Sequence, residues 1–118
     1  NGLTTRTNIK KSQLNVLRVK NFLDQTKLDL ENTINQSLND AQGALKAYQA
    51  AKKTKLARET AYNYAKERFE NGALNTINFL QAQQLFEASQ SDLIKAKYDY
   101  IFKIKVLEFY FGVPNLYL

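Results

Sequence analysis

The chain has 118 residues, enough for one domain, and a formal net charge of +6. It contains no Cys and no His, which excludes a disulfide framework, thiol and imidazole chemistry and the usual zinc ligands. Its 4 Gly and 1 Pro predict few turns, and no apolar run approaches the roughly 20 residues that span a bilayer. The composition therefore favours long amphipathic helices.

The first residues are interpreted as the end of a preceding segment. Asn1, Gly2 and Leu3 include no initiating Met and no signal-peptide pattern, so the sequence is predicted to be a piece of a longer protein. Gly2 suits a turn. A side-chain oxygen of Thr4, Thr5 or Thr7 can then cap a helix by accepting a free backbone N–H.

A first helix is predicted from about residue 5 to about residue 69, where no proline interrupts. Two rows of residues recur every seven positions, offset by four, and this is the pattern of a coiled-coil seam. The rows are Ile9, Val16, Leu23, Leu30, Ser37, Ala44 and Ala51, and Ile34, Ala41, Tyr48, Lys55, Tyr62 and Phe69. Lys55 and Arg58 also fall on the seam, which predicts looser packing there. Such a helix is about 100 Å long, as in a coiled coil or the wall of a helical barrel.

Two local features of this helix have a simple structural explanation and an alternative. A basic run, Lys46, Lys52, Lys53, Lys55 and Arg58, is typical of a solvated helix face, although basic charge also suits nucleic acid, an acidic partner or an anionic membrane.

Gly43 lies among alanines, although a Gly inside a helix costs about 1 kcal/mol against Ala. Close packing of a neighbouring helix is the favoured reason for it, and a flexible bend is the alternative.

A turn is predicted at residues 70–75. Asn71 and Gly72 readily adopt the left-handed conformation that ends a helix, and Asn75 or Thr76 can cap the next one. The second helix is predicted at residues 76–111, with Gly112 and Pro114 ending it. Its seam alternates large and small residues in steps of three and four: Phe79, Ala82, Phe86, Ser89, Leu93, Ala96, Tyr100, Ile104, Leu107 and Phe111.

The predicted fold is all-α. It is a long antiparallel coiled-coil hairpin with unequal arms, residues 5–69 and 76–111, and residues 1–118 form a single unit. This pairing places Phe111 opposite about Ile34, so the earlier part of the first helix has no partner in the chain. That part carries many large apolar residues, and each one left in water forfeits about 1.5–3 kcal/mol. The sequence therefore predicts a partner, either another copy or a segment outside this sequence.

No catalytic constellation is evident. The sequence offers no nucleophile–His pair, no Gly-rich phosphate loop and no carboxylate cluster with metal-ligand spacing, so we expect no enzyme, no cofactor and no metal site. The acidic residues Asp24, Asp29, Glu31 and Asp40 lie among lysines and are expected to form surface pairs.

The tyrosines, together with the lysines, are compatible with nucleic-acid stacking, but packing between helices is the favoured explanation. Tyr48, Tyr62 and Tyr100 fall on the seams, where packing between helices explains them. Tyr64, Tyr98 and Tyr110 are expected to face other helices or a lumen.

The turn and the second helix carry a spaced motif. Its residues are Arg68, Phe69, Gly72, Asn75, Phe79, Leu80, Ala82, Gln83, Leu85, Ala88, Asp92, Leu93, Ile94, Ala96, Tyr98, Asp99, Tyr100, Leu107 and Gly112. This pattern resembles the outer-membrane efflux proteins of the TolC type over about residues 57–114. The preceding helix agrees with that family in length and character only, and Asn1–Leu3 resembles the end of one of its membrane strands.

The resemblance implies a periplasmic helical hairpin from the second repeat of a Gram-negative outer-membrane protein. Such proteins are homotrimers that form a passive exit duct for efflux or type I secretion. Their partners are the other subunits, a periplasmic adaptor (membrane fusion) protein and, indirectly, an inner-membrane transporter, with no nucleic acid.

By position, Gly72, Ala73 and Leu74 match the family's adaptor-docking turn. Phe69, Asn78 and Gln81 match its tunnel constriction. Asn78 and Gln81 stand where some members have acids, so the resemblance implies an amide or apolar constriction rather than an acidic cation filter.

Two other functions are compatible with parts of the sequence. A structural coiled-coil scaffold that binds proteins through its seams explains the heptads but not the spaced motif. A basic helical nucleic-acid binder explains only the charge, and salt-dependent binding would reveal it.

Overall fold

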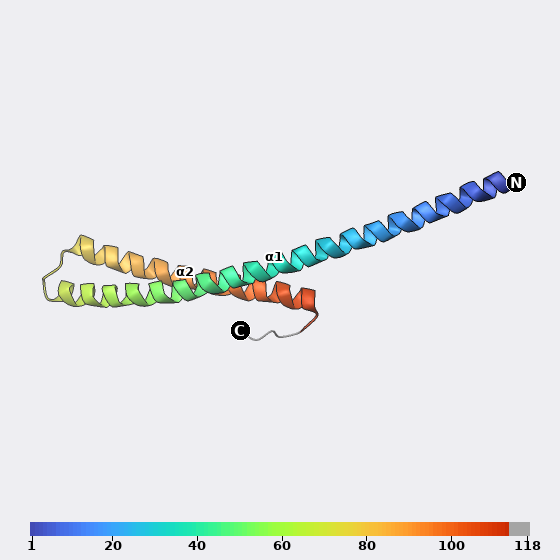
Figure 1. Cartoon of the computed structure of the whole chain (residues 1–118). Coiled ribbons are helices and arrows are strands. Elements are labelled where there is room, and N and C mark those ends of the chain that lie inside the picture. Colours follow the sequence, from blue (N-terminus) through green and yellow to red (C-terminus); the bar gives the residue numbers. More distant parts are fainter. Residues whose placement is uncertain (114–118) are drawn as a thin grey trace. The chain divides into compact units, whose positions relative to one another are not determined.

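The computed structural model describes residues 1–113, which form two α-helices and no strand (Figure 1). Helix α1 spans Gly2–Glu70 and helix α2 spans Thr76–Phe111, with residues 71–75 between them. The predicted all-α fold and the unequal lengths of the two helices are confirmed. Helix α2 has the predicted bounds, Gly112 ends it with a positive φ of 64°, and Pro114 lies outside the described residues.

The N-terminal boundary differs from the prediction. Helix α1 begins at Gly2, and its cap is Asn1, whose Oδ1 accepts the backbone N–H of Leu3 at 3.3 Å. Neither Thr5 nor Thr7 is a cap, because their hydroxyls donate to the carbonyls of Asn1 and Leu3, four residues back, at 3.2 and 2.9 Å. The expected turn at Gly2 is therefore wrong, and residues 2 and 3 are helical.

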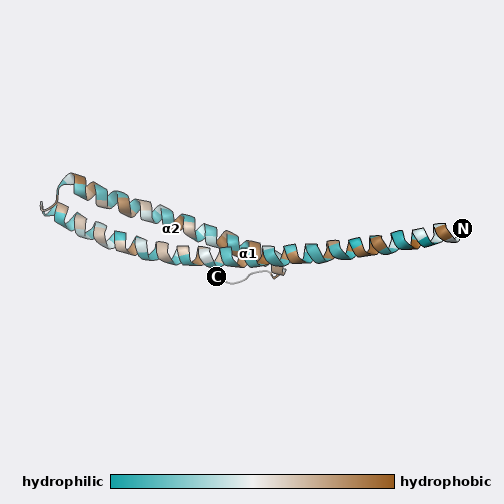
Figure 2. Cartoon of the chain, turned by 45° about the horizontal axis from the view of Figure 1, so that its top comes forward, coloured by the Kyte–Doolittle hydropathy of each residue, from teal (hydrophilic) through white to brown (hydrophobic). Residues whose placement is uncertain are grey.

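Residues 1–36 and residues 37–118 form two compact units. In the first unit every residue from 1 to 33 is exposed. Its exposed large apolar side chains are Leu3, Ile9, Leu14, Val16, Leu17, Val19, Phe22, Leu23, Leu28 and Leu30. Hydrophobic positions therefore recur along this part of α1 (Figure 2), and their large side chains are exposed, as predicted. Burial of each large side chain by a partner is worth about 1.5–3 kcal/mol.

The second unit is an antiparallel hairpin of α2 and the later part of α1 (Figure 1). Its register is set by aromatic pairs that are symmetric about Leu74. Tyr48 and Tyr100 each lie 26 residues from Leu74, and their ring centroids are 6.1 Å apart. By the same symmetry Phe111 falls opposite Ser37, three residues beyond the predicted position near residue 34, and residue 37 is where the second unit begins.

The core of the hairpin is thin and made of small side chains. Its buried residues are Ala41, Ala44, Ala65, Ser89 and Leu107. The predicted seam residues of α2 from Phe79 to Leu107 are all buried or half-buried, as are those of α1 from Ile34 to Phe69 with the exception of Arg58. No described large side chain is fully buried. The two helices alone therefore leave much apolar surface uncovered.

Two seam assignments are wrong. Arg58 is exposed, and Glu59 is half-buried in its place, where it pairs with the half-buried Lys55 at 2.6 Å. Phe111 is 53% exposed, because it is the last residue of α2 and lies where the pairing ends.

The other features of α1 are surface features. Four of the five basic residues in the predicted run are exposed, which fits a solvated face, and the fifth is the half-buried Lys55. Gly43 is also exposed, and a Cβ built there meets nothing within 4 Å. No helix among the described residues packs against Gly43 where a side chain would be, so the predicted close packing does not occur within the hairpin.

Candidate docking tip and constriction

The turn between the helices closes α1 with a Schellman motif. The N–H of Ala73 donates to the carbonyl of Arg68 at 2.8 Å, and the N–H of Gly72 donates to the carbonyl of Phe69 at 3.0 Å. Gly72 takes the left-handed position that this motif requires, with φ of 74°. The Arg68 Nη2 also donates to the Ala73 carbonyl at 3.2 Å. The prediction that Asn71 and Gly72 end the first helix is confirmed. The helix extends to Glu70, one residue beyond the predicted last residue, Phe69.

The start of α2 is fixed by the side chain of Asn75. Its backbone is extended (φ −76°, ψ 159°) and its Oδ1 accepts the N–H of Asn78 at 2.8 Å. This bond satisfies one of the free backbone donors at the helix N-terminus. The prediction that Asn75 or Thr76 caps this helix is confirmed for Asn75.

The three residues predicted to dock an adaptor lie together in this turn. Gly72 and Ala73 are exposed, and Leu74 is half-buried. A Cβ at Gly72 meets no atom within 4 Å, so the turn surface is open around it. Because hydrogen bonds fix the chain on both sides of these residues, the turn has a defined backbone shape.

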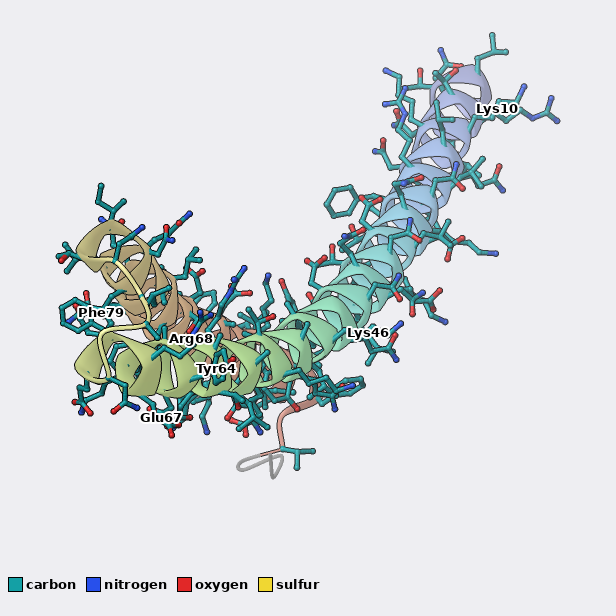
Figure 3. All side chains as sticks on the ribbon, turned by 90° about the vertical axis from the view of Figure 1, so that its left-hand side faces the viewer. Lys10, Lys46, Tyr64, Glu67, Arg68 and Phe79 are labelled. Atoms are coloured by element: carbon teal, nitrogen blue, oxygen red, sulfur yellow. The ribbon has the colours of Figure 1, made fainter. Side chains whose placement is uncertain are left out.

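Aromatic rings hold the end of the hairpin beside the turn. Phe69 stacks on Phe79 with ring centroids 4.6 Å apart and an angle of 10° between the planes. Tyr62 packs on Phe79 at 5.9 Å and on Phe86 at 5.4 Å. Figure 3 shows Phe79 on α2 beside the turn. The seam spacing places all four residues between the helices, but the sequence did not reveal that they form one continuous stack.

The residues predicted to form a constriction are placed differently from one another. Phe69 is half-buried between the helices, in the stack with Phe79. Asn78 and Gln81 are exposed and lie three residues apart, about one turn, on α2. Phe79 follows Asn78 directly, so the ring stack anchors the backbone that carries both amides.

The charged groups nearest the turn in sequence are Glu67, Arg68 and Glu70, all exposed. The Arg68 guanidinium carbon lies 5.7 Å from the ring centroid of Tyr64, and Figure 3 shows both residues on α1 near the turn. Within residues 1–113, no three or more acidic, His or Cys side chains gather in a group able to hold a metal ion.

Neither helix is both long and apolar enough to cross a membrane over its described residues. The structure presents three surface features: an open turn, two exposed amides beside it, and long rows of exposed apolar residues.

Comparison with known proteins identifies the family. The model of the outer membrane efflux protein family matches residues 1–112, almost the whole chain. Searches of curated proteins and of solved structures each gave no match. The family match covers both helices and the turn, including the first helix, which sequence inspection linked to this family only by length and character. The chain belongs to the outer membrane efflux protein family.

Proposed function

We propose that this chain is the periplasmic helical hairpin of a trimeric outer-membrane channel, an exit duct for efflux or secretion. The observation that carries the proposal is the match of residues 1–112 to the outer membrane efflux protein family. Energy for export comes from an inner-membrane transporter, and a periplasmic adaptor protein couples it to the channel. The hairpin contributes part of the tunnel wall and performs no catalysis.

The outer side of α2 supports a place in a wall of helices. Besides the residues that face α1, this helix carries a second row of exposed, large apolar side chains. These are Ile77, Leu80, Ile94, Tyr98, Phe102 and Phe109. At 3.6 residues per turn they lie on the side of α2 away from α1. A helix with apolar rows on two opposite sides suits a position between two neighbours.

One flank of α1 supports the same arrangement in a complementary way. Exposed small residues recur there in steps of four and three, beside the residues that face α2, and Tyr64 ends the row. They are Gly43, Ala47, Ala50, Thr54, Ala57 and Ala61. Small side chains let a neighbouring helix come close, and knobs of a second helix fit between them. In this proposal Gly43 packs against a helix outside this sequence.

The uncovered apolar residues of the first unit support a partner as well. Those from Leu3 to Leu30 would cost about 1.5–3 kcal/mol each if they stayed in water. In the proposed channel they pack on helices from the rest of the protein or from a neighbouring subunit.

In the proposed complex the turn is the end that meets the adaptor. Gly72 and Ala73 offer an open surface, and Leu74 offers an apolar side chain. Asn78 and Gln81, exposed beside the turn, form the constriction as a ring of amides contributed by the three subunits. Phe69 supports the two amides indirectly, because its stack on Phe79 holds the backbone segment that carries Asn78 and Gln81.

A matched pair of substitutions in the full-length channel tests docking at the turn. Ala73→Asp adds one carboxylate to the exposed turn, whereas Asn63→Asp adds one to an exposed site on α1 outside it. Neither position needs a positive φ, so the backbone is not strained. We expect Ala73→Asp to abolish export while the amount of trimer in the outer membrane is unchanged, and Asn63→Asp to export normally. Normal export by Ala73→Asp would rule out docking at this turn, and would leave a scaffold role.

A further inference from the structure

A crevice of about 370 Å³ lies between the helices of the second unit, away from the turn. Tyr48 and Tyr100, whose rings stack, line it together with the aliphatic residues Leu45 and Ile101 and the polar residues Gln49, Lys52 and Lys97. The crevice is within the size range of pockets for small molecules. Both helices contribute a tyrosine, an aliphatic residue and a lysine, so it exists only when the hairpin is formed.

The charge in this crevice is unbalanced. No carboxylate lines it, and no ion pair within 4 Å involves Lys52 or Lys97 among residues 1–113. The nearby Asp99 is paired with Lys103 at 3.0 Å. The Lys52 Nζ instead lies 4.1 Å from the ring centroid of Tyr48, in a cation–π contact. Two lysines therefore line one concave site, and the described residues that line it include no carboxylate.

We infer that this crevice binds small planar aromatic carboxylates. The carboxylate would lie between the ammonium groups of Lys52 and Lys97, and the aromatic body would lie against the aliphatic and tyrosine side chains. An inorganic anion would satisfy only the two lysines, and a neutral aromatic only the apolar lining. An aromatic acid uses both parts of the lining, because its carboxylate meets the lysines and its ring meets the apolar side chains. The inference rests on the crevice alone and does not depend on the proposed transport function.

Titration of the chain with the fluorescent probe 2-naphthoate tests the inference. Lys52→Gln and Lys97→Gln each remove one ammonium group. Lys46→Gln is the matched control, because Lys46 is an exposed lysine of α1 (Figure 3) that does not line the crevice. We expect each crevice variant to bind about three- to five-fold more weakly, as suits a solvent-accessible ion pair. The double variant should be weaker by roughly the product of the two effects, and Lys46→Gln should bind like the unmodified chain.

Two further measurements distinguish an aromatic acid from a neutral aromatic molecule and from an inorganic anion. The neutral analogue 2-naphthylmethanol should bind more weakly than 2-naphthoate, and inorganic phosphate should not displace the probe at equal concentration. Lys52→Arg keeps the positive charge and should restore most of the affinity. Circular dichroism of each variant checks that the helices are intact. Equal binding by all the lysine variants, equal displacement by phosphate, or no binding of 2-naphthoate would each overturn the inference.

Discussion

Phe69 and Phe79 stack face to face at 4.6 Å, five residues to either side of Leu74. The pair Tyr62 and Phe86, 12 residues to either side of the same leucine, stacks at 5.4 Å. In an antiparallel hairpin, several ring pairs can be centred on the same residue only if the pairing register of the two helices stays constant along their length. The aromatic pairs therefore set the register of the hairpin, and the ring stack beside the turn is its firmest part.

Replacing Phe79 should test this stack directly. Phe79→Ala removes contacts with both Phe69 and Tyr62, so the free energy of unfolding of the chain should fall by about 1–3 kcal/mol. Phe102→Ala is the control, because Phe102 is 67% exposed and should change stability by no more than about 0.5 kcal/mol. Urea unfolding followed by circular dichroism measures both. Equal effects would mean that the stack does not hold the hairpin together.

Gly72 and Gly43 should respond in opposite directions to replacement by alanine. Gly72 has φ of 74°, where a Cβ is strained, so Gly72→Ala should destabilise the chain by about 1 kcal/mol. Gly43 is helical and a Cβ there meets nothing within 4 Å, so Gly43→Ala should stabilise it by about 0.5–1 kcal/mol. Thermal unfolding of the two variants gives the comparison, and a shift of the same sign in both would contradict it.

The side chain of Asn75 should contribute more to the stability of the chain than the side chain of Asn78. Asn75→Ala loses the bond to the N–H of Asn78 and should cost about 0.5–2 kcal/mol, whereas Asn75→Asp keeps an acceptor and should cost little. Asn78→Ala is the control, since its backbone N–H, not its side chain, makes that bond. Loss of stability in Asn78→Ala comparable with that in Asn75→Ala would show that the cap is not the cause.

The pair of Lys55 and Glu59 should contribute little despite its 2.6 Å distance. Its side chains are 30% and 37% exposed, so solvent screens the charges, and we expect a coupling energy below about 1 kcal/mol. A double-mutant cycle with Lys55→Gln and Glu59→Gln measures it, and added salt should reduce it. A larger coupling, unaffected by salt, would indicate a buried polar layer rather than a half-exposed pair.

The sequence predicts the helices well because their signals are local and repeated. The seam from Phe79 to Leu107, the cap at Asn75 and the left-handed Gly72 each follow from spacing or from backbone preference. The register of the pairing was three residues off, because it depends on which rings meet across the helices. Arg58 and Phe111 were placed on the seam by periodicity alone, but an ion pair and a helix end decide those positions.

Less of the candidate site than of the helices could be predicted from the sequence. Gly72, Ala73 and Leu74 lie in one turn, as their adjacency requires, yet what the turn contacts depends on molecules outside the chain. Phe69 was grouped with Asn78 and Gln81 from family position, whereas its ring packs between the helices and the two amides are exposed. The crevice joins residues from both helices: Lys52 belongs to the basic run of the first helix, but the sequence does not show that it shares a crevice with Lys97.

The most direct test of the proposed channel is photo-crosslinking in cells that produce the full-length protein with its export partners. A photoreactive residue replaces Ala73 in the turn or, in a second strain, Ala57 in the small-residue row of α1. The proposal predicts that position 73 crosslinks to the periplasmic adaptor protein, and that position 57 crosslinks to helices of the channel itself. Crosslinking of position 57 to the adaptor, with none from position 73, would contradict the proposed orientation of the hairpin.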